Sequence, residues 1–151
     1  MADIISVYGK LLLEAMGQTL IMAFYSLIFA SIIGLIFGML SVLKSKVCNV
    51  MAQVFVDIIR GVPMIVLAFF VFFGVPYALK NFLHSTFTFT ALQAGIICLS
   101  LNCGAYMSEI IRAGIQSVDV GQMEAARSLG IPYWKSMQMV VLPQAIRTMI
   151  P

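Results

Sequence analysis

The sequence predicts an all-α integral membrane protein, with three transmembrane helices followed by a helix–turn–helix on the cytoplasmic side. Two observations predict this class. Of the 151 residues, 62% are hydrophobic and only 10% are charged, whereas soluble domains carry roughly 25% charged residues. The apolar residues also gather in long charge-free stretches, and a membrane-spanning helix needs about 20 such residues in succession. We therefore predict one transmembrane domain over residues 1–151.

Three stretches are long enough to cross a bilayer, and we expect spans near residues 19–43, 54–79 and 90–111. Each stretch is apolar on all sides, which is typical of a helix surrounded by lipid rather than of a two-faced soluble helix. The last apolar run, residues 137–142, is too short to cross and is followed by Pro143.

Basic residues predict the orientation, because Lys and Arg concentrate on the cytoplasmic side of a membrane protein. If the N-terminus is outside, only Lys10 and Lys80 lie outside. The basic residues at or near the cytoplasmic face are then Lys44, Lys46, Arg60, Arg112, Arg127, Lys135 and Arg147. We therefore predict a multi-pass protein of the cell (inner or cytoplasmic) membrane. In a membrane protein this distribution is more informative than the net charge of +3, and no nucleic-acid partner is expected.

Small residues recur at four-residue intervals in the first span, at Ser26, Ala30, Gly34 and Gly38. This spacing places them along one helix face, where small side chains let a second helix approach closely. We expect a packing seam on this face.

Two features at the start of the second expected span are candidates for a gate or hinge at the cytoplasmic mouth. Asp57 and Arg60 are three residues apart, so they are expected to pair on one helix face, and Glu109 and Arg112 repeat this spacing. Pro63 lacks a backbone donor and bends or breaks the helix. The alternative, a plain helix entry into the membrane, stays open.

Three polar residues lie in the third expected span, at Gln93, Ser100 and Asn102. Polar groups in hydrocarbon are costly unless they pair or face a cavity. Hydrogen bonds between helices are the expected use, and the lining of a polar path through the membrane is the alternative.

No set of residues predicts catalysis, a metal site or a cofactor in this chain. The three cysteines lack paired ligand spacing, and His84 has no acidic or cysteine neighbour at ligand distance in the sequence. The phosphate-binding pattern G-x4-G-K-[ST] is missing, because Gly9-Lys10 has neither the preceding glycine nor the following hydroxyl. An ATP-binding role is therefore excluded for these residues.

Residues 112–147 contain the most informative pattern, a predicted helix–turn–helix. Asp119 is a good N-cap, and Gln122 is placed to complete a capping box. Gly130 suits the left-handed residue that ends a helix. Pro132 then fits the first turn of a second helix, and Pro143 bounds it.

This segment resembles a loop of ABC-importer permeases, whose pattern is E-A-A-x3-G-x9-I-x-L-P. The chain has Glu124-Ala125-Ala126, Gly130 and Leu142-Pro143 at these positions, with Val140 in place of isoleucine. Further stretches resemble the polar amino-acid branch of the family, of the histidine, glutamine, arginine and opine type. They are Gly17-Gln-Thr19-Leu20, Arg60-Gly61-x-Pro63, Ala105-Tyr106-x-x-Glu109-Ile-x-Arg112-Ala-Gly114, Gly121-Gln122-x-Glu124 and Leu142-Pro143-Gln144-Ala145-x-Arg147.

The resemblance implies a permease subunit that moves polar amino acids, driven by separate cytoplasmic ATPase subunits that bind ATP and Mg. It also implies a second permease copy or homologue and an extracytoplasmic solute-binding protein as partners. In such permeases the loop docks on the ATPase. The residues that the resemblance assigns to this coupling loop are Gly121, Gln122, Glu124, Ala125, Ala126, Leu129, Gly130, Leu142 and Pro143.

Two alternatives to an amino-acid permease remain at this point. One is a permease of the same superfamily for another small solute, because a separate binding protein selects the solute. The other is a truncated membrane protein that transports nothing. Permeases of this family usually continue for two more spans after the loop, whereas this sequence stops at Pro151. We therefore expect an incomplete transmembrane domain that does not transport by itself.

Overall fold

The computed structural model of the chain describes residues 2–43, 45–84 and 87–149, without the side chains of residues 2–7 and 83. Two of the residues used above, Lys44 and Pro151, lie outside the described part. The described residues form the elements α1 (Ala2–Val42), α2 (Lys46–Gly61), α3 (Met64–Phe69), η1 (Phe70–Gly74), α4 (Val75–Leu83), α5 (Ala91–Gln116), α6 (Val120–Ser128), α7 (Tyr133–Ser136), η2 (Met137–Val141) and α8 (Leu142–Met149). Here η marks a π-helical turn, in which the hydrogen bond spans five residues instead of four.

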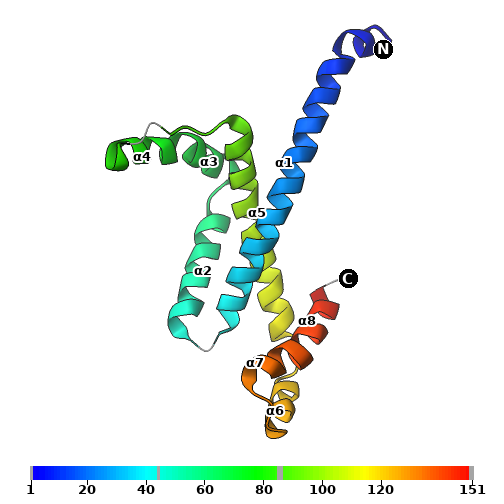
Figure 1. Cartoon of the computed structure of the whole chain (residues 1–151), viewed down its shortest axis with the longest axis vertical. Coiled ribbons are helices and arrows are strands. Elements are labelled where there is room, and N and C mark those ends of the chain that lie inside the picture. Colours follow the sequence, from blue (N-terminus) through cyan, green and yellow to red (C-terminus); the bar gives the residue numbers. More distant parts are fainter. Residues whose placement is uncertain (1, 44, 85–86, 150–151) are drawn as a thin grey trace.

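The predicted all-α class with three candidate spans is confirmed. The helices long and apolar enough to cross a membrane are Tyr8–Val42, Met64–Phe82 and Ala91–Gln116. Figure 1 shows α1 and α5 crossing at the centre of the molecule, with α2 alongside them. The segment from α3 to α4 extends sideways, and α6, α7 and α8 gather at the end where α5 finishes.

The second expected span is not one helix over 54–79. Helix α2 begins at Lys46 and ends at Gly61, and α3 begins at Met64. Pro63 causes the break, because it donates no backbone hydrogen bond and pushes the preceding residue out of the helical region. Val62 is accordingly extended, with φ −95° and ψ 129°. The predicted break at Pro63 is therefore confirmed, and the expected start of the span near residue 54 is wrong.

The small-residue seam on α1 is confirmed, and its partner is α5. Ser26 and Ala30 are buried, and Ser26 Oγ donates to the carbonyl oxygen of Ile96 over 3.3 Å. At Gly34 the methyl carbon of an alanine side chain would lie only 2.6 Å from Cβ of Met107. The two backbones are therefore in contact, as small residues permit.

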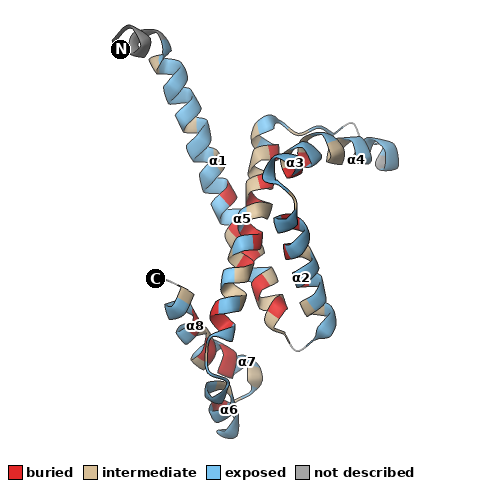
Figure 2. Ribbon diagram, turned by 180° about the vertical axis from the view of Figure 1, so that it is seen from behind, coloured by how far each residue is buried: buried red, intermediate tan, exposed pale blue. Residues whose placement is uncertain are grey.

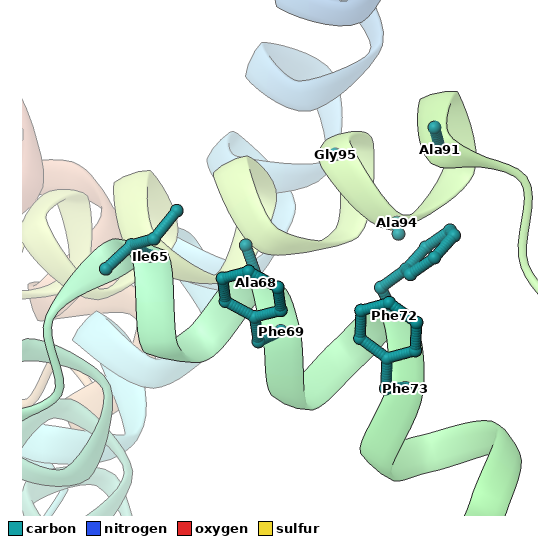
Figure 3. A pocket seen from close by; sticks show the side chains of 8 residues that line it. All are labelled: Ile65, Ala68, Phe69, Phe72, Phe73, Ala91, Ala94 and Gly95. Atoms are coloured by element: carbon teal, nitrogen blue, oxygen red, sulfur yellow. The ribbon is translucent and has the colours of Figure 1, made fainter.

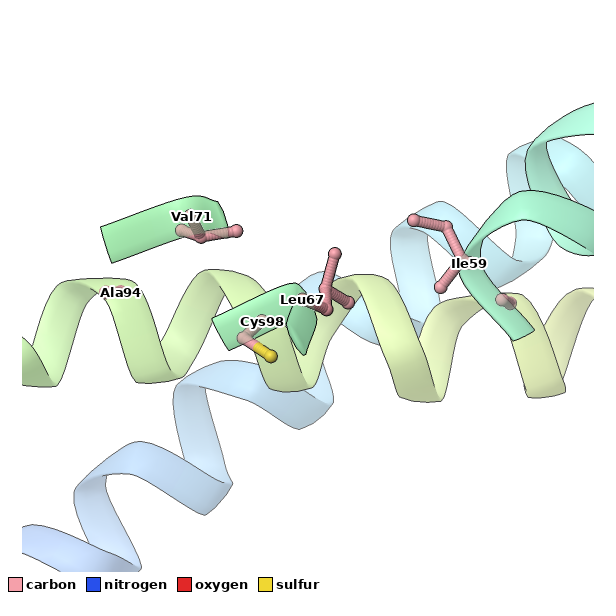
Figure 4. Close-up of a cluster of buried hydrophobic side chains, with 6 residues drawn as sticks. Ile59, Leu67, Val71, Ala94 and Cys98 are labelled. Atoms are coloured by element: carbon pink, nitrogen blue, oxygen red, sulfur yellow. The ribbon is translucent and has the colours of Figure 1, made fainter. Parts of the chain in front are cut away.

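Two apolar cores lie at different levels of the structure. The first joins α2, α3, η1 and α5, and Figure 4 shows Ile59, Leu67, Val71, Ala94 and Cys98 facing one another there. The second lies where α5 meets η2 and α8, and its buried members are Ile115, Met137, Val141 and Ala145. Figure 2 shows that most other helix surface is exposed in the single chain, as expected when lipid or further helices cover it.

Candidate functional site

The candidate site is a helical hairpin, α6–α7, at the end of α5. Asp119 begins it, because its Oδ1 accepts a hydrogen bond from the Gly121 backbone N–H over 2.6 Å. Gly130 ends α6 with φ +80°. Its N–H donates to Arg127 O over 3.0 Å, and the Ile131 N–H donates to Ala126 O over 3.3 Å. This pair of bonds is a Schellman motif, which requires a left-handed residue and therefore favours glycine.

The capping box expected at Asp119 and Gln122 is not formed. The Asp119 carboxylate bonds the second residue of α6, Gly121, instead of the third. The Gln122 side chain points to α8, where its Oε1 accepts from Gln144 Nε2 over 3.3 Å. A capping box occurs instead at the start of α5, between Thr90 and Gln93.

Polar contacts tie the hairpin to the helices that flank it. Besides the Gln122–Gln144 bond, Ser117 Oγ at the end of α5 lies 3.2 Å from Thr148 Oγ1 of α8. The buried Ser136 Oγ donates to Ile131 O over 3.3 Å and so closes the turn. Together with the second apolar core, these bonds hold α6, α7 and α8 against the end of α5.

The structure divides the residues of the expected coupling loop into two groups. Gly121, Gln122, Glu124 and Ala125 are exposed on α6, and Leu129 is 81% exposed beside Gly130. Ala126, by contrast, is only 6% exposed. At the start of α8, Leu142 is half-buried against the second core and Pro143 is exposed. The outward surface of the hairpin is therefore formed by the first group.

The expected Asp57–Arg60 pair is not among the ion pairs of the described residues, whereas the expected Glu109–Arg112 pair is formed. Arg60 instead lies over the ring of Tyr106, with its guanidinium carbon 4.9 Å from the ring centroid. Arg60 is the next-to-last residue of α2, about 21 Å along the helix from Lys46 at the rise of an α-helix. It therefore lies far from the helix end where α1 terminates, and a role of Asp57, Arg60 and Pro63 as a gate or hinge stays a prediction.

The contact between Arg60 and Tyr106 joins α2 to α5 just before the break at Pro63. Tyr106→Leu is expected to lower the free energy of unfolding by about 1 kcal/mol, because the cation–π attraction is lost. Equilibrium unfolding in mixed detergent micelles measures this. Tyr106→Phe keeps the aromatic ring and is the matched control, so equal losses in both variants would show that the ring does not bind Arg60.

The three polar residues of α5 do not make the hydrogen bonds between helices that we expect of them. Gln93 bonds Thr90 in the capping box, and Ser100 Oγ donates to Ile96 O in its own helix over 2.5 Å. Asn102 is half-buried. A role for these residues in a polar path stays a prediction.

An apolar groove of about 370 Å³ lies between the α3–η1 segment and the start of α5. Figure 3 shows Phe69 and Phe72 on one side and Ala91 and Ala94 on the other. Its lining consists of apolar side chains and a glycine. No charged group of a polar solute would find a partner on this lining.

Sequence reasoning missed the contacts that join distant segments. Nothing in the local pattern of Ser117 or Gln122 indicates a partner on α8, and Tyr106 is an ordinary aromatic residue of an apolar span.

Within the described residues no group of three or more His, Cys, Asp or Glu side chains is arranged to hold a metal ion.

Three helices long and apolar enough to cross a membrane, followed by a capped helical hairpin, define an all-helical protein of the membrane class. Residues 30–151 match the family model described as binding-protein-dependent transport system inner membrane component, and the chain belongs to this family.

Curated relatives agree with this assignment. The chain is 37% identical to a probable amino-acid ABC transporter permease protein, YckA of Bacillus subtilis, over 92% of this chain and 58% of that protein. It is 41% identical to a putative glutamine transport system permease protein, GlnP of Rickettsia prowazekii, over 95% of this chain and 64% of that protein. The chain thus spans about three fifths of the length of these relatives. Their names are those of transport components and not of enzymes.

Solved structures share the fold. A crystal structure of an amino acid ABC transporter with histidines matches with a TM-score of 0.80 and 34% identity, over 97% of this chain and 65% of that chain. The MetNI methionine ABC transporter matches with a TM-score of 0.73 at 23% identity, over 92% of this chain and 64% of that chain. The second match supports the fold alone. The predicted resemblance to amino-acid ABC permeases is therefore confirmed at the level of the family.

Proposed function

We propose that this chain belongs to the permease subunit of an ATP-driven importer of polar amino acids, and that the hairpin α6–α7 docks on a separate ATPase. The hairpin carries the proposal. It presents Glu124, Ala125 and Leu129 outward, and the small Ala125 lets another surface approach the backbone closely. Its buried side is held on α5 by the second core, so a force on the hairpin is transmitted to the membrane helices.

Basic residues at the hairpin end of the molecule support the proposed orientation in the membrane. Lys46 begins α2, Arg112 lies in the last turns of α5, and Arg127 and Lys135 lie on the hairpin. Figure 1 places these segments together at the end opposite the start of α1. Because Lys and Arg favour the cytoplasmic side, this end is cytoplasmic and the N-terminus is outside.

Partners complete the transporter. ATP and Mg²⁺ bind to the ATPase subunits, a second permease copy or homologue completes the membrane part, and an extracytoplasmic solute-binding protein delivers the amino acid. The proposed amino-acid substrate is supported by the names of relatives, which are described as glutamine and arginine transport permeases.

Glu124→Lys tests the docking surface. The variant is expected to reduce co-purification of the ATPase with the full-length permease by about tenfold, because a charge reversal at an interface removes an attraction and adds a repulsion. Glu14→Lys makes the same change on an exposed residue of α1 and is the matched control. ATPase bound to Glu124→Lys as fully as to Glu14→Lys would contradict the assignment.

Uptake of a labelled amino acid by the full-length permease with its ATPase and binding protein tests the substrate class. Uptake of another small solute alone would favour the superfamily alternative. Absence of any uptake with all partners bound would favour a non-transporting membrane protein.

A further inference from the structure

Two wide helical turns of the structure share one sequence order, in which a π-helical turn is followed by one residue and then a proline. In η1 the Val75 N–H donates to Phe70 O, five residues back, and Pro76 follows. In η2 the Leu142 N–H donates to Met137 O, also five residues back, and Pro143 follows.

Proline explains the shared position of these turns. It has no N–H to bond the carbonyl four residues back, and in an α-helix its ring clashes with that carbonyl. A wide turn just before the proline moves the carbonyl aside while the helix continues. Because π-helical residues make up well under about 1% of globular proteins, two occurrences at the same offset from a proline indicate a common cause.

The wide turn η2 changes which side of the helix faces the second core. From α7 to α8 five side chains of this core are spaced four residues apart, at Tyr133, Met137, Val141, Ala145 and Met149, and Leu142 beside Val141 also packs against it. A four-residue spacing drifts by about 40° per step in an α-helix, so Tyr133 and Met149 would differ in direction by about 160°. One residue inserted by the wide turn reduces this to about 60°, which keeps both ends on the core.

We propose that Pro143 is a positioning residue, which holds the wide turn η2 and thereby sets the rotation of the hairpin relative to α8. Its effect on transport rests on the proposed function of the hairpin. With η2 in place, Trp134 is exposed and Ser136 and Met137 face inward. Without it, α7 and α8 would be rotated against each other by about 100°, the angle of one helical residue.

The rotation is measurable by labelling single cysteines with a maleimide in the purified full-length permease, with the native cysteines replaced by alanine. Three buried positions serve as probes, Ser136→Cys, Met137→Cys and Ala145→Cys. Ser136 and Ala145 are 0% exposed and Met137 is 4% exposed, so all three are expected to be protected in the parent protein.

Pro143→Ala is expected to expose one of the outer probes and to leave Met137→Cys protected. If α7 turns, Ser136 takes the direction that the exposed Lys135 has now, and if α8 turns, Ala145 takes the direction of the exposed Ile146. Pro76→Ala removes the corresponding proline from η1, far from the hairpin, and is expected to leave all three probes protected. Unchanged labelling in Pro143→Ala, or exposure of all three probes together, would overturn the proposal.

The effect of the rotation on transport is measured in the same variants. ATP-driven uptake by Pro143→Ala is expected to fall by about tenfold, within the range of couplings between distant sites. Shifted labelling with full uptake would overturn the link from this rotation to transport. The proposed docking function fails separately if Glu124→Lys binds the ATPase fully. If Pro143→Ala still shifts the labelling in that case, the role of Pro143 in setting the helix rotation is unaffected.

Discussion

Gly34→Ala is expected to separate α1 from α5 and to lower the free energy of unfolding by about 1–3 kcal/mol, the usual cost of overpacking. The added methyl group would lie 2.6 Å from Met107 Cβ and 3.3 Å from both Gly104 O and Ser108 N. These atoms belong to the backbone of α5 or are attached directly to it, so no side-chain rotation relieves the contact. The helices must move apart, and the neighbouring contacts of the seam weaken with them.

The matched control for this change is Gly17→Ala in the same helix. A methyl group there has nothing within 4 Å, and alanine is a better helix former than glycine by about 1 kcal/mol. The two variants are therefore expected to shift the midpoint of unfolding in mixed micelles in opposite directions. A stability of Gly34→Ala equal to that of the parent protein would show that the seam is not in contact in the membrane.

Gly130→Pro is expected to disrupt the hairpin and to reduce ATPase association by at least about tenfold, because proline in an unsuitable position costs about 3 kcal/mol. Gly130 has φ +80°, whereas the proline ring holds φ near −65°. Proline also removes the N–H that bonds Arg127 O. The turn between α6 and α7 then cannot form as observed, and the exposed Glu124 is no longer presented in a fixed direction.

A series of substitutions at Gly130 distinguishes the need for a positive φ in the turn from a need for glycine itself. Gly130→Asn is expected to lose less association than Gly130→Ala, because asparagine adopts positive φ more readily than alanine. Co-purification of the ATPase with each full-length variant measures the order. Equal association of the parent protein and Gly130→Pro would contradict both the turn and the docking role built on it.

Much of the fold could be predicted from local chemistry. Pro63 donates no backbone hydrogen bond and restricts the residue before it, so a bend or break before α3 could be predicted. The helix before Pro63 could not be separated from the span that follows it. Asp119 and Gly130 mark the ends of α6 by their own hydrogen bonding and backbone freedom. The partner of Gln122 could not be predicted. Its side chain is able to bond the start of its own helix or a residue of α8, and only folding brings the second partner near.

The candidate site shows the same division. Glu124, Ala125 and Ala126 are adjacent in the sequence, and their common motif does not distinguish the exposed pair from the buried Ala126. Helix phase and the position of α5 make that distinction. Arg60 likewise has Asp57 at a suitable spacing along its own helix, but its guanidinium group lies over the ring of Tyr106 on α5.

The sequence by itself determined the membrane class, the presence of three apolar spans, the helix break at Pro63 and the capped hairpin. Each follows from hydropathy or from residues whose backbone preferences act locally. The tertiary structure decided that the glycine seam of α1 packs on α5, and that polar bonds join the hairpin to α8. It also decided that a wide turn before Pro143 keeps one helix face on the second core. These features depend on helix rotation, which is set by the packing of several segments at once.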